Sequence, residues 1–301
     1  HGTIEGIGQT SLLKITNAIS GNSQGAIKGN LQLCDLNGIE GAYSGNIFNP
    51  VVEACDLFIP TSACYKEGNG NSNVLDTDFD GVADNLDFYP NDPTLSGNSY
   101  YPSSGGFATL MFEDLWPGKG DYDFNDLVVS YCHRMVTNSD NLVTRVESKI
   151  VVKAIGGSLK NGFGFQFNVA PTSIESVTGS VLTEGIVSEA NNGTEKGQSK
   201  ATIIVFDNAY STVADNRGAG FVNTNISEPG VEMDTLTIVT TFVSPVSYTA
   251  LGEGPFNPFI FIDRDRGREV HLVNHEPTDL INEDYFGSAS DDSNPEAGRY
   301  F

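Results

Sequence analysis

The sequence predicts an all-β fold, an antiparallel β-sandwich or jelly roll, and two observations support this prediction. Helical periodicity is nearly absent along the 301 residues. The apolar segments are short, rich in β-branched and aromatic residues, and separated by Gly, Asn, Asp, Ser and Pro. Repeated short segments of this kind, with turn signals between them, are typical of a sandwich of antiparallel strands.

The candidate strands follow one another through the second two thirds of the chain. They are Ala108–Glu113, Leu127–Met135, Leu142–Ala154, Gly162–Val169, Lys200–Asp207, Glu232–Val243 and Pro258–Ile262. The run from Val143 to Val152 approaches the alternation of a half-buried strand. Phe163, Phe165 and Phe167 occupy alternate positions, so a strand would place all three rings on one face.

Changes in composition divide the chain into three parts. Residues 1–66 form a small amino-terminal β region, 67–106 an acidic connector, and 107–301 the sandwich domain. The segment Glu67–Asn73 has the Gly, Asn and Ser content of a solvated linker. The first part is small, so we expect it to depend on a disulfide or on its neighbour to stay folded.

The charge is strongly unbalanced, with 39 Asp and Glu against 16 Lys and Arg and a net charge of −23. Such a surface repels nucleic acid and anionic lipid and attracts cations. No apolar run approaches the roughly 18 residues that a membrane span needs. The chain begins at His1 without a Met, so we expect a mature or trimmed terminus.

The cysteine pattern favours an exported protein, secreted or held at the cell surface. Cys34, Cys55, Cys64 and Cys132 include no Cys-x-x-Cys pair, which argues against zinc or redox chemistry. In an oxidising compartment two of the first three would pair, and the sequence leaves the connectivity open. Cys132 lies in a strand-like run and is expected to be a buried thiol.

The sharpest motif is the segment Asp76–Asp87, in which carboxylates alternate around a glycine. Calcium takes six to eight hard oxygen ligands, and alternate carboxylates in a tight loop supply them. Gly81 stands where such a loop must turn sharply. The predicted ligands are Asp76, Asp78, Asp80, the backbone carbonyl of Val82, Asp84 and Asp87. An acidic, solvated linker is the alternative.

A second acidic cluster lies between two candidate strands. Its predicted ligands are Asp121, Asp123, Asn125 and Asp126, together with Glu113 or Asp114. Calcium is favoured over Mg²⁺, which prefers fewer protein ligands and more water. The alternative is an acidic hairpin turn that uses Asp and Asn for its turn chemistry.

Four blocks of sequence resemble the LruC domain of exported and surface proteins of Gram-negative bacteria. They are Phe112–Pro117, Gly120–Asp126, Gly267–Leu272 and Pro277–Asp279. The resemblance covers roughly residues 100–301 and implies export and a β fold, with no established activity. The segment Asp76–Asp87 lacks the flanking helices and final Glu of an EF-hand, and resembles a thrombospondin type 3 or dockerin-like loop. Members of the LruC family usually run further, so we expect a truncated or processed carboxy terminus.

A third charged segment, Asp263–Glu269, alternates acidic and basic residues after a strand. We expect a hairpin tip with ordinary exposed ion pairs, each contributing little. The alternative is that Asp263 reaches the second metal cluster.

Enzymatic motifs are absent from the sequence. There is no nucleophile elbow or phosphate loop, and His271 and His275 lie on no predicted helix. Glu113 and Asp121 could form a glycosidase pair, but no aromatic groove is apparent in the sequence and Trp116 is the only Trp. The expected function is therefore a calcium-stabilised structural or adhesion module without catalysis, with a protein or glycan as surface ligand. A fibre subunit that self-associates by exchanging a strand such as Leu12–Thr16 is the alternative.

Overall fold

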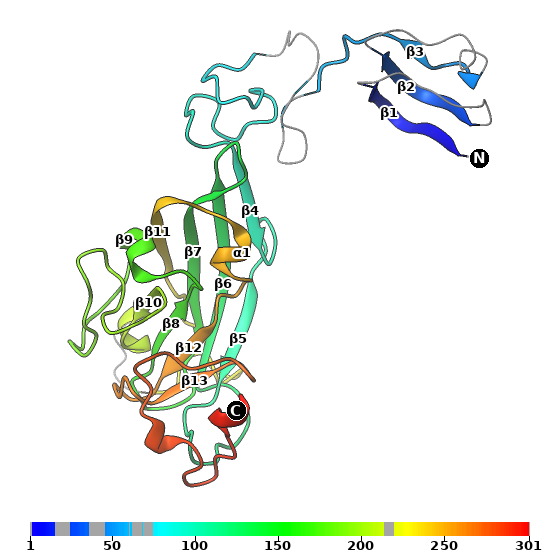
Figure 1. The fold of residues 1–301 in the computed structure, drawn as a ribbon. Helices are drawn as coiled ribbons and strands as arrows, with labels where there is room; N and C mark the ends of the chain where they lie inside the picture. The colour runs from blue at the N-terminus through cyan, green and yellow to red at the C-terminus, as the bar shows by residue number, and fades with distance from the viewer. Residues whose placement is uncertain are drawn as a thin grey trace. The chain divides into compact units, whose positions relative to one another are not determined.

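The computed structural model describes residues 2–15, 25–35, 46–59, 61, 68, 75–213 and 220–300. The chain forms two compact units, His1–Thr94 and Leu95–Phe301, each of which is described by itself (Figure 1). Cys64, Thr16 and most of the predicted linker Glu67–Asn73 lie outside the described residues.

The first unit contains a small three-stranded sheet and one disulfide. Its strands are β1 (Thr3–Ile15), β2 (Ala26–Asp35) and β3 (Val52–Glu53), which pair in parallel in that order. Ile27, Leu31 and Leu33 form its buried apolar cluster. The bond between Cys34 and Cys55 joins β2 to the segment after β3, which settles a pairing that the sequence left open. A core this small gains much of its stability from such a crosslink.

The second unit is a sandwich of two antiparallel sheets, so the predicted all-β class is confirmed. The larger sheet has the order β4-β6-β7-β11-β9, with β5 also paired to β6, and the smaller has the order β10-β8-β12-β13 (Figure 1). The strands are β4 (Gly97–Tyr101), β5 (Ala108–Phe112), β6 (Leu127–Thr137), β7 (Val143–Ala154), β8 (Gly162–Gln166), β9 (Ile174–Thr178), β10 (Thr202–Phe206), β11 (Thr235–Val246), β12 (Pro258–Phe261) and β13 (Glu269–His271). The helices are short: α1 (Tyr248–Leu251) and the 3₁₀ turns Pro171–Ser173, Ala209–Thr212, Glu283–Tyr285 and Pro295–Ala297. Within the described residues no helix is long and apolar enough to cross a membrane.

The core between the sheets is aromatic. Phe163, Phe165 and Phe167 are each 0–1% exposed and belong to one apolar cluster, as their alternate spacing predicted. Burying such a side chain contributes roughly 1.5–3 kcal/mol relative to leaving it in water. Strand β7 likewise buries Ile150 and Val152, while Lys149 and Lys153 on either side of them face solvent. Cys132 is buried as predicted, and burial raises the pKa of its thiol.

Each of the seven predicted strands is present, with ends that differ by a few residues. Strands β4, β9 and β13 were not predicted, because they are three to five residues long and partly polar, which hides any alternation. Strand β4 lies in the segment that the sequence pattern assigns to the connector, yet it pairs with β6 of the sandwich. The boundary between the two compact units falls after Thr94.

Candidate functional site

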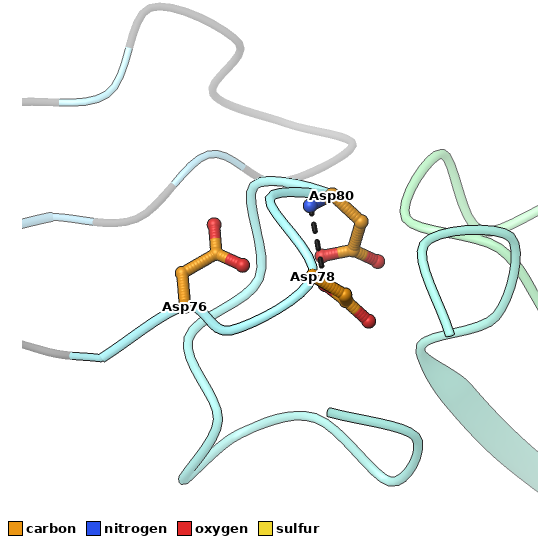
Figure 2. A group of neighbouring side chains, drawn as sticks. All are labelled: Asp76, Asp78 and Asp80. Carbon is orange, nitrogen blue, oxygen red and sulfur yellow. Dashed lines mark hydrogen bonds between the residues drawn. The ribbon is translucent and has the colours of Figure 1, made fainter. Parts of the chain in front are cut away.

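The loop Asp76–Asp87 holds its carboxylates through its own backbone amides. Asp76 accepts hydrogen bonds from the amides of Phe79 (2.8 Å) and Gly81 (3.2 Å). One oxygen of Asp78 accepts from the amide of Asp80 at 3.2 Å, as Figure 2 shows. Phe79 and Gly81 both have positive φ, 63° and 93°, so the chain turns at the predicted glycine and also two residues before it.

This geometry gathers carboxylate oxygens that the loop itself leaves unpaired. One oxygen each of Asp76, Asp78 and Asp80 can be chosen so that all three lie within 4.8 Å of one another (Figure 2). The Oδ2 atoms of Asp78, Asp80 and Asp87 are buried and have no hydrogen-bond partner among the described residues. Buried polar atoms normally have partners, so these three carboxylate oxygens are the donors of the loop that a cation could use.

Burial and neighbouring carboxylates raise the pKa values of two members of the loop, Asp80 and Asp87. Desolvation raises the pKa of Asp80, and the neighbouring charges of Asp78, Asp87 and Asp76 raise it further. Desolvation likewise raises the pKa of Asp87, again with contributions from the other carboxylates of the loop. Like charges at this density repel one another unless a cation or protons compensate them.

Two of the six predicted ligands, Asp84 and Val82, make hydrogen bonds that shape the loop itself. Both oxygens of Asp84 accept hydrogen bonds from Thr77, one from its amide and one from its hydroxyl, each at 2.7 Å. The amide of Val82 donates to Asp80 at 2.7 Å, so this residue also shapes the loop. Asp84 therefore closes the loop onto its beginning.

The carboxylates of the second cluster, which begins just after β5, fall into two groups. Glu113, Asp121 and Asp123 offer oxygens within 4.8 Å of one another. One oxygen of Glu113 accepts from the amide of Phe124 at 2.6 Å, and the other is buried without a partner among the described residues. A Cβ atom on Gly120 would lie only 1.9 Å from that second oxygen, so glycine is required where the loop passes over Glu113.

Asp114 and Asp126 form a separate, more buried pair. The amide of Asp114 donates to Asp126 at 2.8 Å, and the side-chain amide of Asn161 donates to Asp114 at 2.7 Å. Desolvation and the adjacent Asp114 raise the pKa of Asp126 to about 6. Asn125 donates its side-chain amide to Asp123 and so supports the first group. Nothing in the sequence pattern indicated Asn161, because it lies on a different segment of the chain.

The segment Asp263–Glu269 forms the predicted hairpin tip, between β12 and β13, but the expectation that its ion pairs are all exposed was wrong. The side chain of Arg266 is only 10% exposed and donates to Glu195 through Nε (2.6 Å) and Nη2 (2.7 Å), and also to Glu269. These two glutamates are 1% and 0% exposed. The carboxylate of Asp263 accepts from the amide of Lys160, and the backbone amide of Asp263 donates to Asn161, the residue that contacts Asp114.

The buried network continues through His271 and Thr278. Glu269 accepts from the hydroxyl and the amide of Thr278 and lies 2.8 Å from Nε2 of His271. Burial alone would raise the pKa of Glu269, but the hydrogen bond from His271 and the charge of Arg266 outweigh it and hold this pKa at about 2. His271 is therefore part of this buried cluster, with Nε2 beside Glu269 and Nδ1 2.9 Å from the side-chain oxygen of Asn257.

The four blocks that carry the LruC resemblance meet in space, and the first two do so where Glu113 accepts the amide of Phe124. Arg268 donates to the backbone carbonyl of Trp116 at 2.5 Å, and Thr278 donates to Glu269. Trp116 in turn donates from Nε1 to Asp291 at 2.9 Å and contacts Phe286 edge to face. These residues tie β13 and the segments after it to the turn that follows β5.

Comparison with known proteins places the chain in a family. A family model described as a domain of unknown function, DUF4842, matches residues 141–301, more than half of the chain, and the protein therefore belongs to the DUF4842 family. No curated protein matches the sequence. A crystal structure described as a "Putative lipoprotein" from Bacteroides ovatus is 17% identical, with a TM-score of 0.43, and the match covers 60% of this chain and 56% of that one. The chain thus spans little more than half the length of that protein, and the family description names no activity.

Proposed function

We propose that this protein is a calcium-stabilised structural or adhesion module of an exported protein, and that it has no catalytic activity. The observation that carries the proposal is the set of buried carboxylate oxygens without hydrogen-bond partners in two acidic loops, on Asp78, Asp80, Asp87 and Glu113. A divalent cation in each loop would compensate these oxygens and the repulsion between the neighbouring carboxylates.

The residues present fit calcium. In the first loop the ion would be held by Asp76, Asp78, Asp80 and Asp87 with the carbonyl of Val82, while Asp84 keeps the loop closed through Thr77. In the second it would be held by Glu113, Asp121 and Asp123. All these donors are hard oxygens on flexible loops, which suits the larger coordination shell of calcium. We propose the first loop as thrombospondin type 3-like and the sandwich as LruC-like.

Export is supported by the covalent structure and by the composition. The disulfide between Cys34 and Cys55 is of the kind that forms and persists in oxidising compartments. A net charge of −23 suits a medium rich in divalent cations. In the extracellular millimolar range of calcium even a weak loop would be filled.

The bound ion would stabilise the folded protein because it binds the folded state and not the unfolded chain. An ion that binds only the folded loop adds RT ln(1 + [L]/Kd) to the free energy of unfolding, about 2.7 kcal/mol at a hundredfold excess over Kd. The same ion would fix the positions of the loop backbone, because the coordinating carboxylates already accept hydrogen bonds from it.

The proposal is tested by thermal unfolding in excess calcium and in excess chelator. Chelation should lower the melting temperature of the wild type, and the double variant Asp78→Ala/Asp80→Ala should lose the part of that shift that comes from the first loop. The matched control is Glu232→Ala/Asp234→Ala, which removes the same charge at the same spacing from an exposed segment outside both loops. An unchanged melting curve on chelation, with no metal in the purified protein, would reject calcium binding and reopen the carboxylate-enzyme alternative.

The fibre alternative is less favoured. Leu12, Leu13, Lys14 and Ile15, the described part of the suggested donor segment, pair with β2 within their own unit. Within this sheet β1 is paired on one side only, so a second copy could meet it only along the edge that β2 does not cover. Gel filtration over a range of concentrations is the direct test of self-association.

A further inference from the structure

A groove of about 590 Å³ runs along the open side of the sandwich. One wall comes from the end of β5 and the loop that follows it, with Met111, Tyr122 and Phe124. The other wall comes from the end of β13 and the residues after it, with Leu272 and Val273. Each of these strands pairs on one side only, β5 with β6 and β13 with β12 (Figure 1). Residues of these two edge strands line the groove.

The apolar side chains of this groove are unusually exposed. Met111 is 51% exposed, Tyr122 60%, Phe124 45% and Val273 65%. Single exposed apolar residues are common on protein surfaces, but several that line one groove mark a binding surface. No sequence pattern indicates this aromatic groove, because its walls come from segments about 150 residues apart.

The loop holds its two aromatic residues in an unfavourable backbone conformation. Tyr122 and Phe124 have φ of 57° and 55°, a region that costs a non-glycine residue of order 1 kcal/mol. Glu113 fixes this conformation by accepting the amide of Phe124. Strain that keeps two aromatic rings in solvent is the kind of feature that accompanies ligand contact.

The charged groups of the groove are acidic. Glu113, Asp291 and Asp292 line it, and no Lys or Arg does so among the described residues. Asp292 pairs at 3.4 Å with Arg299, although the Asp292 side chain remains 88% exposed. His271 also lines the groove, and its ring is engaged by Glu269 and by Asn257. An anionic ligand would therefore be repelled, and a ligand with positive charges would be attracted.

These observations together define one occupant. We propose that the groove binds an extended peptide segment of a partner protein in which apolar and basic side chains alternate. Edge strands offer backbone groups to an added strand, an apolar floor accepts every second side chain, and the carboxylates face the basic ones. A glycan fits less well, because it needs free directional polar groups and Asp291 is already engaged by Trp116, Gly287 and Ser293. This inference goes beyond the proposed structural role. In calcium its charge complementarity rests on Asp291 and Asp292, because Glu113 is one of the proposed calcium ligands.

The single Trp of the chain gives a direct readout, since Trp116 lines the groove. The experiment titrates the full chain, in calcium, with a peptide of about eight alternating Val and Lys residues, a length typical of one strand, and follows Trp fluorescence. We expect a saturable change with this peptide. A twin with Glu in place of Lys, and a peptide of the same composition in two blocks, should bind at least about tenfold more weakly.

Variants place the binding in the groove. Met111→Arg and Val273→Arg should each weaken binding by about tenfold or more, because they add a like charge and fill the floor. Val243→Arg is the matched control: Val243 is 62% exposed on β11 and is not among the groove residues, so binding should be unchanged. Circular dichroism and the melting temperature confirm that each variant is folded.

Four results would overturn the proposal: no saturable change with the alternating peptide, equal binding of the acidic or block peptide, full binding by both groove variants, or saturation only by neutral oligosaccharides. Self-association of the protein alone that both groove variants abolish would also overturn it, in favour of a second copy as the occupant.

Discussion

Replacing Arg266 by Met would test whether the hairpin tip is a buried charged cluster or a set of surface ion pairs. The arginine is 10% exposed and contacts Glu195 through two of its nitrogens and Glu269 through a third. Its guanidinium also lies 5.0 Å from the centre of the Phe259 ring. Met keeps much of the side-chain volume, so the main effect is to leave two buried carboxylates without their cation.

The expected loss of stability follows from the pKa of Glu269. A carboxyl held at about 2 instead of an ordinary 4.5 contributes about 3 kcal/mol to the free energy of unfolding. Because this pKa is depressed in the folded state, the contribution is present above about pH 4.5 and is lost as the pH falls toward 2. Breaking buried ion pairs costs about 3–5 kcal/mol in other proteins, so we expect a loss in that range at pH 7.

Urea unfolding at pH 7 and at pH 4.5 is the assay. The deficit of Arg266→Met should shrink at the lower pH, because protonation relieves the uncompensated glutamates. Arg264→Met is the matched control: Arg264 is two residues away, 46% exposed and 3.6 Å from Glu184, and its loss should cost at most about 1 kcal/mol. Similar small effects for both variants, or a pH-independent deficit, would refute the buried-cluster argument.

Three further predictions concern separate parts of the molecule. His133 is buried, and desolvation lowers its pKa to about 3. The free energy of unfolding of the wild type should therefore fall by about 2–3 kcal/mol between pH 7.5 and 4.5. Urea unfolding should show a smaller fall for His133→Gln. Gly120→Ala should lower the free energy of unfolding by about 1–3 kcal/mol and weaken cation binding by the second loop in calorimetry, because the added methyl group meets Glu113. Adding Glu113→Ala should restore the stability but not the binding. Cys34→Ser/Cys55→Ser should lower the free energy of unfolding of the first unit by about 3 kcal/mol, measured by hydrogen exchange. Unchanged exchange rates in that unit would show that the disulfide adds no stability.

The sequence was sufficient for features that depend on neighbouring residues. Alternation placed Phe163, Phe165 and Phe167 in one core, because successive side chains of a strand point to opposite faces. The loop around Gly81 is similar: Asp76, Asp78 and Asp80 converge through hydrogen bonds within a few residues of each. Such contacts need no information about the rest of the chain.

The tertiary structure decided everything that depends on segments far apart in the chain. Adjacent in sequence, Glu113 and Asp114 belong to different groups, because the chain that leaves β5 brings one side chain to Asp121 and the other to Asn161. The charged hairpin tip has the composition of a surface, and only its packing against Glu195 buries Arg266. The groove exists because residues of two edge strands, one from each sheet, line it together. Local periodicity sets the direction of each side chain, but pairing and packing between distant segments determine what it meets.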